Sequence, residues 1–262
     1  MSARRPRLLV RRMVPRAVFA QLWGDRDRWG RTPRTDDPMW DEWLSTYADF
    51  YEQNQRVGIG RVVNGAGYRV MRRIDLEGRT VLEVGPGEIS HVTWWRGRPR
   101  TVHLVDVDEE MARRGSRVLQ REGVPHDACL VERTDSLPFP DGSVDVVVTF
   151  FSLEHIHPIE PYLAELHRIL TPGGVLVGAI PAEGGLAWGL GRWLTTRRWF
   201  LANTTIDPDK VICWEHPNFA DTVLDALRHT FGKGKVSRWP LPFVPGIDAN
   251  LVLRFVFRKL AR

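Results

Sequence analysis

One short stretch of the chain combines residue types that can bind the ribose of a nucleotide. The segment Val81–Ser90 has the pattern of a buried strand, a glycine-rich turn and the start of a helix. Gly85 and Gly87 allow backbone to come close to a ligand where a Cβ would collide. Asp106 ends the next apolar run, and its carboxylate can accept hydrogen bonds from two ribose hydroxyls. The spacing therefore predicts a nucleotide-ribose site.

Three further blocks follow in order: Leu137–Gly142, which leads into the apolar run Val144–Thr149, then Phe151–Ile156, and then Arg168–Val177. With the first block, they resemble the class I S-adenosylmethionine-dependent methyltransferases, in particular the type 11 branch that includes quinone-biosynthesis-like enzymes. The resemblance covers about residues 79–181. It implies the methyl donor S-adenosylmethionine in place of a dinucleotide. A dinucleotide site would need a third glycine near Ile89 and a hydride-transfer site downstream, and the sequence shows neither.

The resemblance implies roles for the residues that match the motifs of the family. The turn Gly85–Gly87 would pass closest to the amino-acid tail of the donor. Glu83 would orient this turn or meet the amino group of the donor, although a carboxylate that only stabilises the turn is an equal interpretation. Asp106 would bind the ribose hydroxyls, and Val107 would lie along the adenosine.

The sequence departs from the family pattern at two positions. Ile89 replaces the usual third glycine, so we expect either a different helix start or weaker binding beside the donor tail. Arg133 stands where the family commonly has an acidic residue that contacts the adenine amino group. We expect the backbone of Thr134 and the side chain of Asp135 to serve instead.

A histidine follows the fourth predicted strand, where ligands gather in parallel α/β sheets. His155 closes the segment Phe150–His155, which should face the methyl group, and its imidazole can accept a proton from an attacking hydroxyl. The alternative is that His155 holds the loop through hydrogen bonds. His91, His157 and His216 are further candidates for a base. The sequence shows no cluster of residues with the spacing of metal ligands. We expect methyl transfer from this donor to require no metal ion.

Strand and helix patterns alternate through the middle of the chain. This alternation predicts an α/β fold with parallel strands and crossover helices. Two late apolar runs complete the predicted sheet. We therefore expect a Rossmann-like fold with a seven-stranded, mostly parallel sheet, an antiparallel last strand and helices on both faces. The predicted strands are 80–84, 101–106, 127–132, 144–149, 174–180, 235–239 and 250–258, and the predicted helices of this part are 89–96, 108–121, 158–170 and 217–231.

The sequence divides into three ranges. Residues 1–35 are a basic N-terminal extension, and residues 36–77 are a helical cap with aromatic residues at helical spacing. Residues 78–262 are the methyltransferase domain, with an apolar insertion at 182–213. We interpret this insertion, which is rich in glycine and tryptophan, as a mobile lid or a wall of the acceptor site.

Composition narrows the class of partner. The chain has 262 residues and a net charge of +5. Nearly all of its positive side chains are arginines, and beyond the N-terminus these arginines are dispersed. We therefore expect no nucleic-acid partner, whereas the basic and partly apolar N-terminus allows peripheral membrane contact. The two cysteines, Cys129 and Cys213, match no metal spacing and suit a reducing cytoplasm.

We therefore expect a cytoplasmic methyltransferase, most simply an O-methyltransferase, acting on a small-molecule, natural-product or glycan acceptor. One alternative is methylation of a lipid or isoprenoid quinone at a membrane surface. Another is a non-catalytic protein that binds S-adenosylmethionine as a sensor or scaffold.

Overall fold

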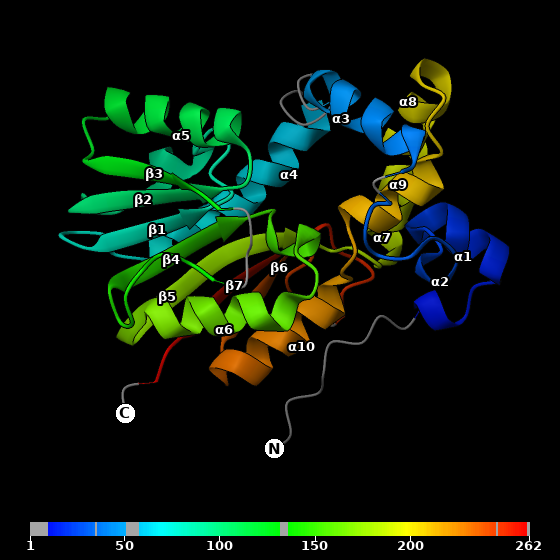
Figure 1. The fold of residues 1–262 in the computed structure, drawn as a ribbon. Helices are drawn as coiled ribbons and strands as arrows, with labels where there is room; N and C mark the ends of the chain where they lie inside the picture. The colour runs from blue at the N-terminus through cyan, green and yellow to red at the C-terminus, as the bar shows by residue number, and fades with distance from the viewer. Residues whose placement is uncertain (1–9, 35, 51–57, 132–135, 245, 261–262) are drawn as a thin grey trace. The chain divides into compact units, whose positions relative to one another are not determined.

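The computed structural model describes residues 10–34, 36–50, 58–131, 136–244 and 246–260. Its centre is a seven-stranded sheet with the strand order β3-β2-β1-β4-β5-β7-β6 (Figure 1). The strands are β1 (Thr80–Val84), β2 (Thr101–Asp106), β3 (His126–Leu130), β4 (Val144–Phe150), β5 (Leu170–Pro181), β6 (Lys235–Trp239) and β7 (Val252–Arg258). The predicted sheet is confirmed.

Strand direction follows from the hydrogen-bond register. Neighbouring strands from β3 to β5 pair in parallel, with Val81 opposite Val102 of β2 and Val146 of β4. Strand β7 runs antiparallel to β5, because the pairs Gly173–Lys259 and Ala182–Leu251 run in opposite directions along the two segments. The predicted antiparallel last strand is therefore confirmed.

The helical elements are α1 (Arg16–Trp23), α2 (Arg26–Trp29), α3 (Pro38–Phe50), α4 (Gly58–Tyr68), α5 (Glu109–Arg121), α6 (Ile159–Ile169), α7 (Leu186–Leu194), α8 (Thr196–Asn203), α9 (Pro208–Glu215) and α10 (Ala220–Phe231). Short 3₁₀ helices lie at η1 (Val10–Arg12), η3 (Arg69–Arg73), η4 (Ser90–Trp94) and η5 (Leu153–His155).

Contacts divide the chain into two compact units. We call residues 67–180, 223–237 and 254–262 the sheet unit, and the described parts of 1–66, 181–222 and 238–253 the helical unit. The ranges predicted from the sequence do not coincide with these units, because the segment 182–213 groups with the N-terminal helices.

The sheet unit is a conventional α/β core. Every residue of β1 is buried, as expected for a central strand covered on both faces. Helix α6 buries one stripe of side chains with helical period, namely Ile159, Tyr162, Leu163, Leu166 and Ile169. Helix α5 begins at the cap residue Asp108, whose side chain accepts hydrogen bonds from two backbone N–H groups, and it lies beside β2 and β3 (Figure 1).

The helical unit is held together partly by buried arginines. Arg192 of α7 donates hydrogen bonds to the carbonyls of Gln21 and Leu22, at 2.6 and 3.0 Å. These carbonyls belong to the last turn of α1, where no intrahelical partner exists. Arg26 donates in the same way to the carbonyls of Trp23 and His216. Residues of the predicted N-terminal extension are therefore part of the core of this unit.

Segment 182–213 contributes apolar residues to the same core. Phe200, Ile206 and Val211 pack with Trp43 of α3. The indole of Trp23 donates a hydrogen bond to the carbonyl of Gly185. The three helices α7, α8 and α9 therefore form an integral part of the helical unit.

Gly178 offers a sharp test of how closely β4 and β5 pack. A Cβ at this position would lie 1.8 Å from the carbonyl oxygen of Thr149 and 2.9 Å from Phe255. Because the first neighbour is backbone, Gly178→Ala must push the strands apart, and we expect a loss of more than about 2 kcal/mol in the free energy of unfolding. Urea unfolding measures this change.

Gly65→Ala in α4 is the matched control, because nothing lies within 4 Å of a Cβ there. We expect it to be neutral or to stabilise the protein by roughly 0.5–1 kcal/mol, since alanine favours helix. Equal unfolding midpoints for the wild type and Gly178→Ala would contradict this description of the strand pair.

Candidate functional site

The carboxyl ends of β1 and β4 meet at a tight contact in the sheet unit. Gly85, just after β1, has φ +63°, and a Cβ on it would lie 3.0 Å from the Cβ of Ser152. The hydroxyl of Ser152 lies 2.5 Å from that of Thr149 and donates to the carbonyl of Val84 at 3.4 Å. The turn predicted at Gly85–Gly87 is therefore close to the segment after β4, as a shared site at this edge requires.

The chain after the turn differs from the predicted helix at 89–96. Ile89 is in the left-handed conformation, with φ 45° and ψ 42°, and a 3₁₀ helix, η4, follows it. The side chain of Ile89 is buried beside Gly115 of α5, where a Cβ would be 3.3 Å from its Cδ1. Of the two expectations for Ile89, the different helix start is the one found. The reason is that this side chain fills the space beside α5.

Glu83 ends a chain of three hydrogen-bonded side chains, in which His91 is the middle member and Trp95 is only partly buried. The indole N–H of Trp95 donates to Nδ1 of His91 at 2.9 Å, and Nε2 of His91 lies 3.0 Å from Oε1 of Glu83. Burial raises the pKa of Glu83, and the attraction of His91 opposes this shift. The second oxygen, Oε2, is buried and has no hydrogen-bond partner among the described residues.

Asp106 ends β2 beside the turn that follows β1. One of its oxygens, Oδ1, accepts a hydrogen bond from the backbone N–H of Asp108 at 2.9 Å. Burial raises its pKa, against the hydrogen bonds from the backbone of Asp108 and Val107. Val107 is exposed. Asp106 and Val107 thus follow the strand next to β1, whereas Thr134 and Asp135 lie outside the described residues.

His155 is exposed and closes the 3₁₀ helix η5 after β4. Its backbone N–H donates to the carbonyl of Ser152 at 3.1 Å, which ties this turn to the contact with Gly85. The structure thus places His155 after the fourth strand, as the sequence indicated.

Aromatic rings pack against His91, the histidine that bonds Glu83. The ring of Tyr68 lies 5.0 Å from that of Phe150 and 5.7 Å from that of His91. Gly67 allows this approach, because a Cβ there would lie 2.8 Å from Phe151. These rings fix His91 and the end of β4 in one apolar layer.

Arg168 of α6 binds the segment 137–141, a contact that the sequence did not predict. Its guanidinium donates to the carbonyls of Leu137 and Phe139 and to the carboxylates of Asp141 and Glu165. It thereby joins two of the four blocks noted in the sequence. The sequence shows Glu165 and Arg168 three residues apart, as in an ion pair on one helix face. Nothing in the local sequence indicates that Arg168 also bonds the carbonyls of Leu137 and Phe139.

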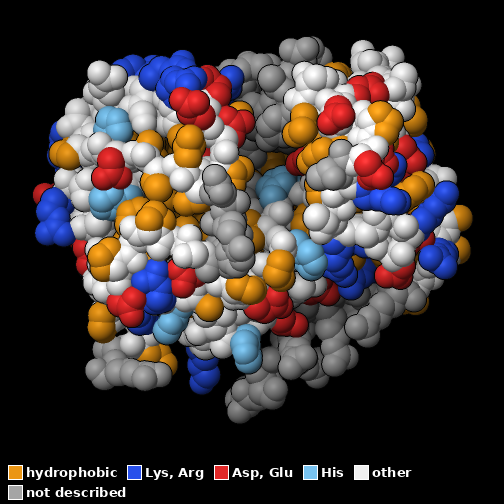
Figure 2. Space-filling model, in the orientation of Figure 1, with side chains coloured by type: hydrophobic (Ala, Val, Ile, Leu, Met, Phe, Trp, Pro, Cys, Tyr) orange, Lys and Arg blue, Asp and Glu red, His pale blue; other side chains and the backbone are white. Residues whose placement is uncertain are grey.

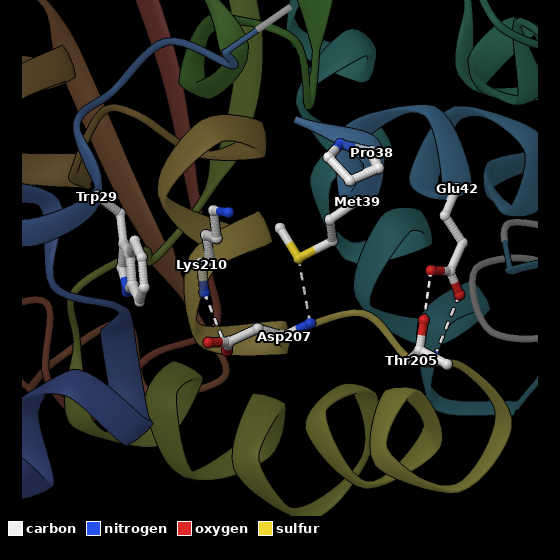
Figure 3. Close-up of a pocket in the computed structure, with 7 residues that line it drawn as sticks. All are labelled: Trp29, Pro38, Met39, Glu42, Thr205, Asp207 and Lys210. Carbon is white, nitrogen blue, oxygen red and sulfur yellow. Dashed lines mark hydrogen bonds between the residues drawn. The ribbon is translucent and has the colours of Figure 1, made fainter. Parts of the chain in front are cut away.

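The helical unit contains a separate pocket of about 360 Å³ (Figure 3). Trp29, Pro38 and Met39 form apolar walls, and the other lining residues are Glu42, Thr205, Asp207 and Lys210. Glu42 accepts hydrogen bonds from Thr205, and Lys210 pairs with Asp37. The polar groups of this pocket therefore join α3 to the segment 205–210.

On the face that Figure 2 shows, basic and acidic side chains are interspersed. Within the part of the chain that the structure describes, no helix is long and apolar enough to cross a membrane.

Comparison with known proteins matches residues 82–178 to the type 11 family described as "Methyltransferase domain". A ubiquinone/menaquinone biosynthesis C-methyltransferase UbiE of Cupriavidus necator is 32% identical over 100 residues, which are 37% of this chain and 41% of that protein. A probable S-adenosylmethionine-dependent methyltransferase of Mycolicibacterium smegmatis is 35% identical over 104 residues, which are 40% of this chain and 38% of that protein. The chain thus spans about two fifths of the length of these curated relatives.

Among solved structures, the fold is similar to an S-adenosylmethionine-dependent methyltransferase from Thermotoga maritima, a possible histamine N-methyltransferase. The TM-score is 0.51 at 15% identity, over 85% of this chain and 98% of the other. At this identity the likeness shows the fold alone. Together with the family match and the strand order described above, it shows that residues 82–178 are a type 11 methyltransferase domain with the class I S-adenosylmethionine-dependent fold.

Proposed function

We propose that the protein transfers a methyl group from S-adenosylmethionine to an acceptor, with the donor held at the carboxyl ends of β1, β2 and β4. The observation that carries this proposal is the contact at Gly85, which leaves bare backbone beside Ser152. Two carboxylates, Glu83 and Asp106, come from the adjacent strands β1 and β2, and each accepts a hydrogen bond within the protein.

The residues present fit this donor. The buried Oε2 of Glu83, which no described residue bonds, suits the ammonium group of the amino-acid tail. The glycine turn offers backbone to the tail, and the carboxylate of Asp106 suits the ribose hydroxyls. The exposed side chain of Val107 offers an apolar surface to the adenosine. Thr134 and Asp135 remain our candidates for the adenine contact.

The bound donor would supply a methyl group that its sulfonium already activates. The chain then has to align an acceptor with the bond between methyl and sulfur and to exclude water. Phe150 ends β4 and Phe151 follows it, and the main chain of Phe151 is fixed by a hydrogen bond from its N–H to the carbonyl of Ala179. We assign these two residues to shaping the space around the methyl group.

His155 is our candidate for the group that accepts a proton from a hydroxyl acceptor. It is exposed and follows β4, at the edge where ligands gather. The competing role is a brace of the loop by its side chain; the hydrogen bond from its backbone N–H to Ser152 does not depend on the side chain and favours neither role.

The leading acceptor is a small molecule, natural product or glycan, methylated on oxygen. A lipid or isoprenoid quinone is the second candidate, and the relatives named for ubiquinone and menaquinone biosynthesis favour it. One surface favours it as well. Leu190, Leu194 and Leu201 of α7 and α8 are 44%, 51% and 58% exposed, and the sequence from 184 to 206 contains three arginines and no carboxylate.

The proposed ribose contact predicts the effect of Asp106→Ala. Loss of a carboxylate that accepts hydrogen bonds from the ribose should cost roughly 1.5–3 kcal/mol, or about 10- to 100-fold in affinity. We expect calorimetry to show this loss for S-adenosylmethionine and for its demethylated product.

Asp127→Ala is the control for Asp106→Ala, because Asp127 lies on the adjacent strand β3 and pairs with His103 at the surface. It should leave the affinity unchanged. Unaltered affinity in Asp106→Ala would remove the ribose contact, and tighter binding of NADH than of the methyl donor would overturn the proposed donor.

Turnover of His155 variants separates the two roles of this residue. If His155 is a general base for a hydroxyl acceptor, His155→Ala should lower turnover by about 10²–10⁴-fold while donor affinity stays constant. If it braces the loop, turnover, donor affinity and melting temperature should fall together, and His155→Asn should recover much of all three. Unchanged turnover in His155→Ala would rule out both roles. Methyl transfer to any product would exclude a non-catalytic sensor.

Binding to vesicles separates the two classes of acceptor. If the surface of α7 and α8 lies on a bilayer, vesicles with anionic lipid should retain the protein, and replacing both Leu190 and Leu194 by Asn should weaken retention by at least about tenfold. Leu241→Asn, another exposed leucine, is the control. Equal sedimentation with and without vesicles would count against a lipid acceptor.

A further inference from the structure

We propose that Trp95 and His91 form a positioning relay that fixes Glu83, so that its second oxygen receives the ammonium group of the amino-acid tail of the donor. This inference rests on the proposed function and assigns two residues to recognition of the tail. Both belong to the segment that replaces the expected helix after Ile89.

The relay has a defined direction. An indole N–H can only donate, so the Trp95 contact of 2.9 Å makes Nδ1 of His91 an acceptor. The hydrogen of the imidazole then lies on Nε2, which donates to Oε1 of Glu83 at 3.0 Å. Both ring nitrogens of His91 are engaged, and His91 therefore has no further group to offer the other carboxylate oxygen.

Burial makes the remaining oxygen significant. Glu83 and His91 are 1% and 2% exposed. Oε2 of Glu83 has no hydrogen-bond partner among the described residues. A buried carboxylate oxygen without a donor is costly, and an arriving ammonium group removes that cost.

The position of Glu83 selects which part of the donor arrives. Glu83 is the fourth residue of the five in β1, and the glycine turn follows directly. In the proposed site, this turn faces the carboxylate of the tail. The ammonium group is attached to the same carbon atom as that carboxylate, so both groups of the tail reach the end of β1 together.

Packing prevents the relay from turning away. The ring of His91 lies 4.8 Å from that of Phe150 and 5.7 Å from that of Tyr68. Trp94, beside Trp95, is covered by the guanidinium of Arg72 at 4.0 Å. These rings therefore hold the imidazole of His91 against Glu83.

Two ligands separate recognition of the tail from recognition of the nucleoside. S-adenosylhomocysteine carries the tail, and 5′-methylthioadenosine carries the same adenosine without it. Calorimetry of both ligands with the full chain should show that Glu83→Gln and His91→Leu lower the affinity for S-adenosylhomocysteine by about 10- to 100-fold. The affinity for methylthioadenosine should change less than about twofold, which is within the ordinary scatter of surface changes.

Conservative variants test the relay against a purely structural role. His91→Gln keeps an N–H group at the position of Nε2 and should recover most of the lost affinity. Trp95→Phe removes the donor to Nδ1 and leaves an aromatic ring, so it should lower the affinity for S-adenosylhomocysteine and leave that for methylthioadenosine unchanged, with at most a small loss in melting temperature. A drop in the affinity for both ligands together with the melting temperature, in His91→Leu and Trp95→Phe alike, would overturn the relay.

The pH profile gives a second readout. Binding of an ammonium group favours ionised Glu83, whose pKa burial raises. The affinity for S-adenosylhomocysteine should therefore rise with pH through that pKa and then level off, and Glu83→Gln should abolish this rise. The titratable groups against the relay are His91 itself and Tyr68, with Arg69 and Arg72 over Trp94. Asp106 affects both ligands, so its contribution cancels in their ratio.

Failure of the relay and failure of the proposed function are distinguishable. If the wild type binds both ligands and Asp106→Ala weakens both, the donor site stands whatever the variants of His91 do. Equal affinity of the wild type for the two ligands would overturn the relay alone. If the wild type binds neither ligand, the donor site and the relay both fall.

Discussion

The structure of the sheet unit depends on the close approach of two strand ends at Gly85. Any side chain at this position would meet Ser152, whose Cβ lies 3.0 Å from the place of the missing Cβ, and φ is +63°. The same serine is held by Thr149 and by the carbonyl of Val84. Because β1 and β4 are locked together here, Glu83 and the segment that ends in His155 come to one edge of the sheet. The chemistry we propose needs this contact more than it needs any single polar group.

The helical unit buries charged side chains, namely Arg26, Arg192 and Glu183. Arg26 is buried, and this burial lowers its pKa to about 10 against the attraction of Glu183. Burial likewise acts to raise the pKa of Glu183, but the hydrogen bond with His216 and the charges of Arg26 and Arg192 outweigh it, so that the pKa is lowered. Glu183 is therefore ionised at neutral pH, and the arginines satisfy carbonyls at the end of α1 while they balance its charge.

How far the sequence could predict these features depends on the range of the interactions. Period and turn residues are local, and so the strands, the mostly parallel sheet with its antiparallel last strand and the turn at Gly85 were predicted correctly, whereas the order of the strands was not predicted. The buried role of Arg26 and Arg192 was not predicted, since arginine usually indicates surface and their partners lie up to 190 residues away. The contacts of Arg168 with Leu137 and Phe139 were missed for the same reason. The link from Trp95 to Glu83 was missed because a helix was expected where a 3₁₀ turn forms.

Ile89 connects the departure from the family pattern to the relay. A left-handed conformation of a β-branched residue costs roughly 1–3 kcal/mol, and glycine would avoid that cost. Full burial of an isoleucine side chain contributes about 1.5–3 kcal/mol, so its packing beside Gly115 offsets the strain. The two ranges overlap, so the burial of Ile89 is of the size needed to offset the strain. The consequence of the left-handed conformation is geometrical: the chain turns at Ile89 into η4, and this short helix brings His91 back over Glu83.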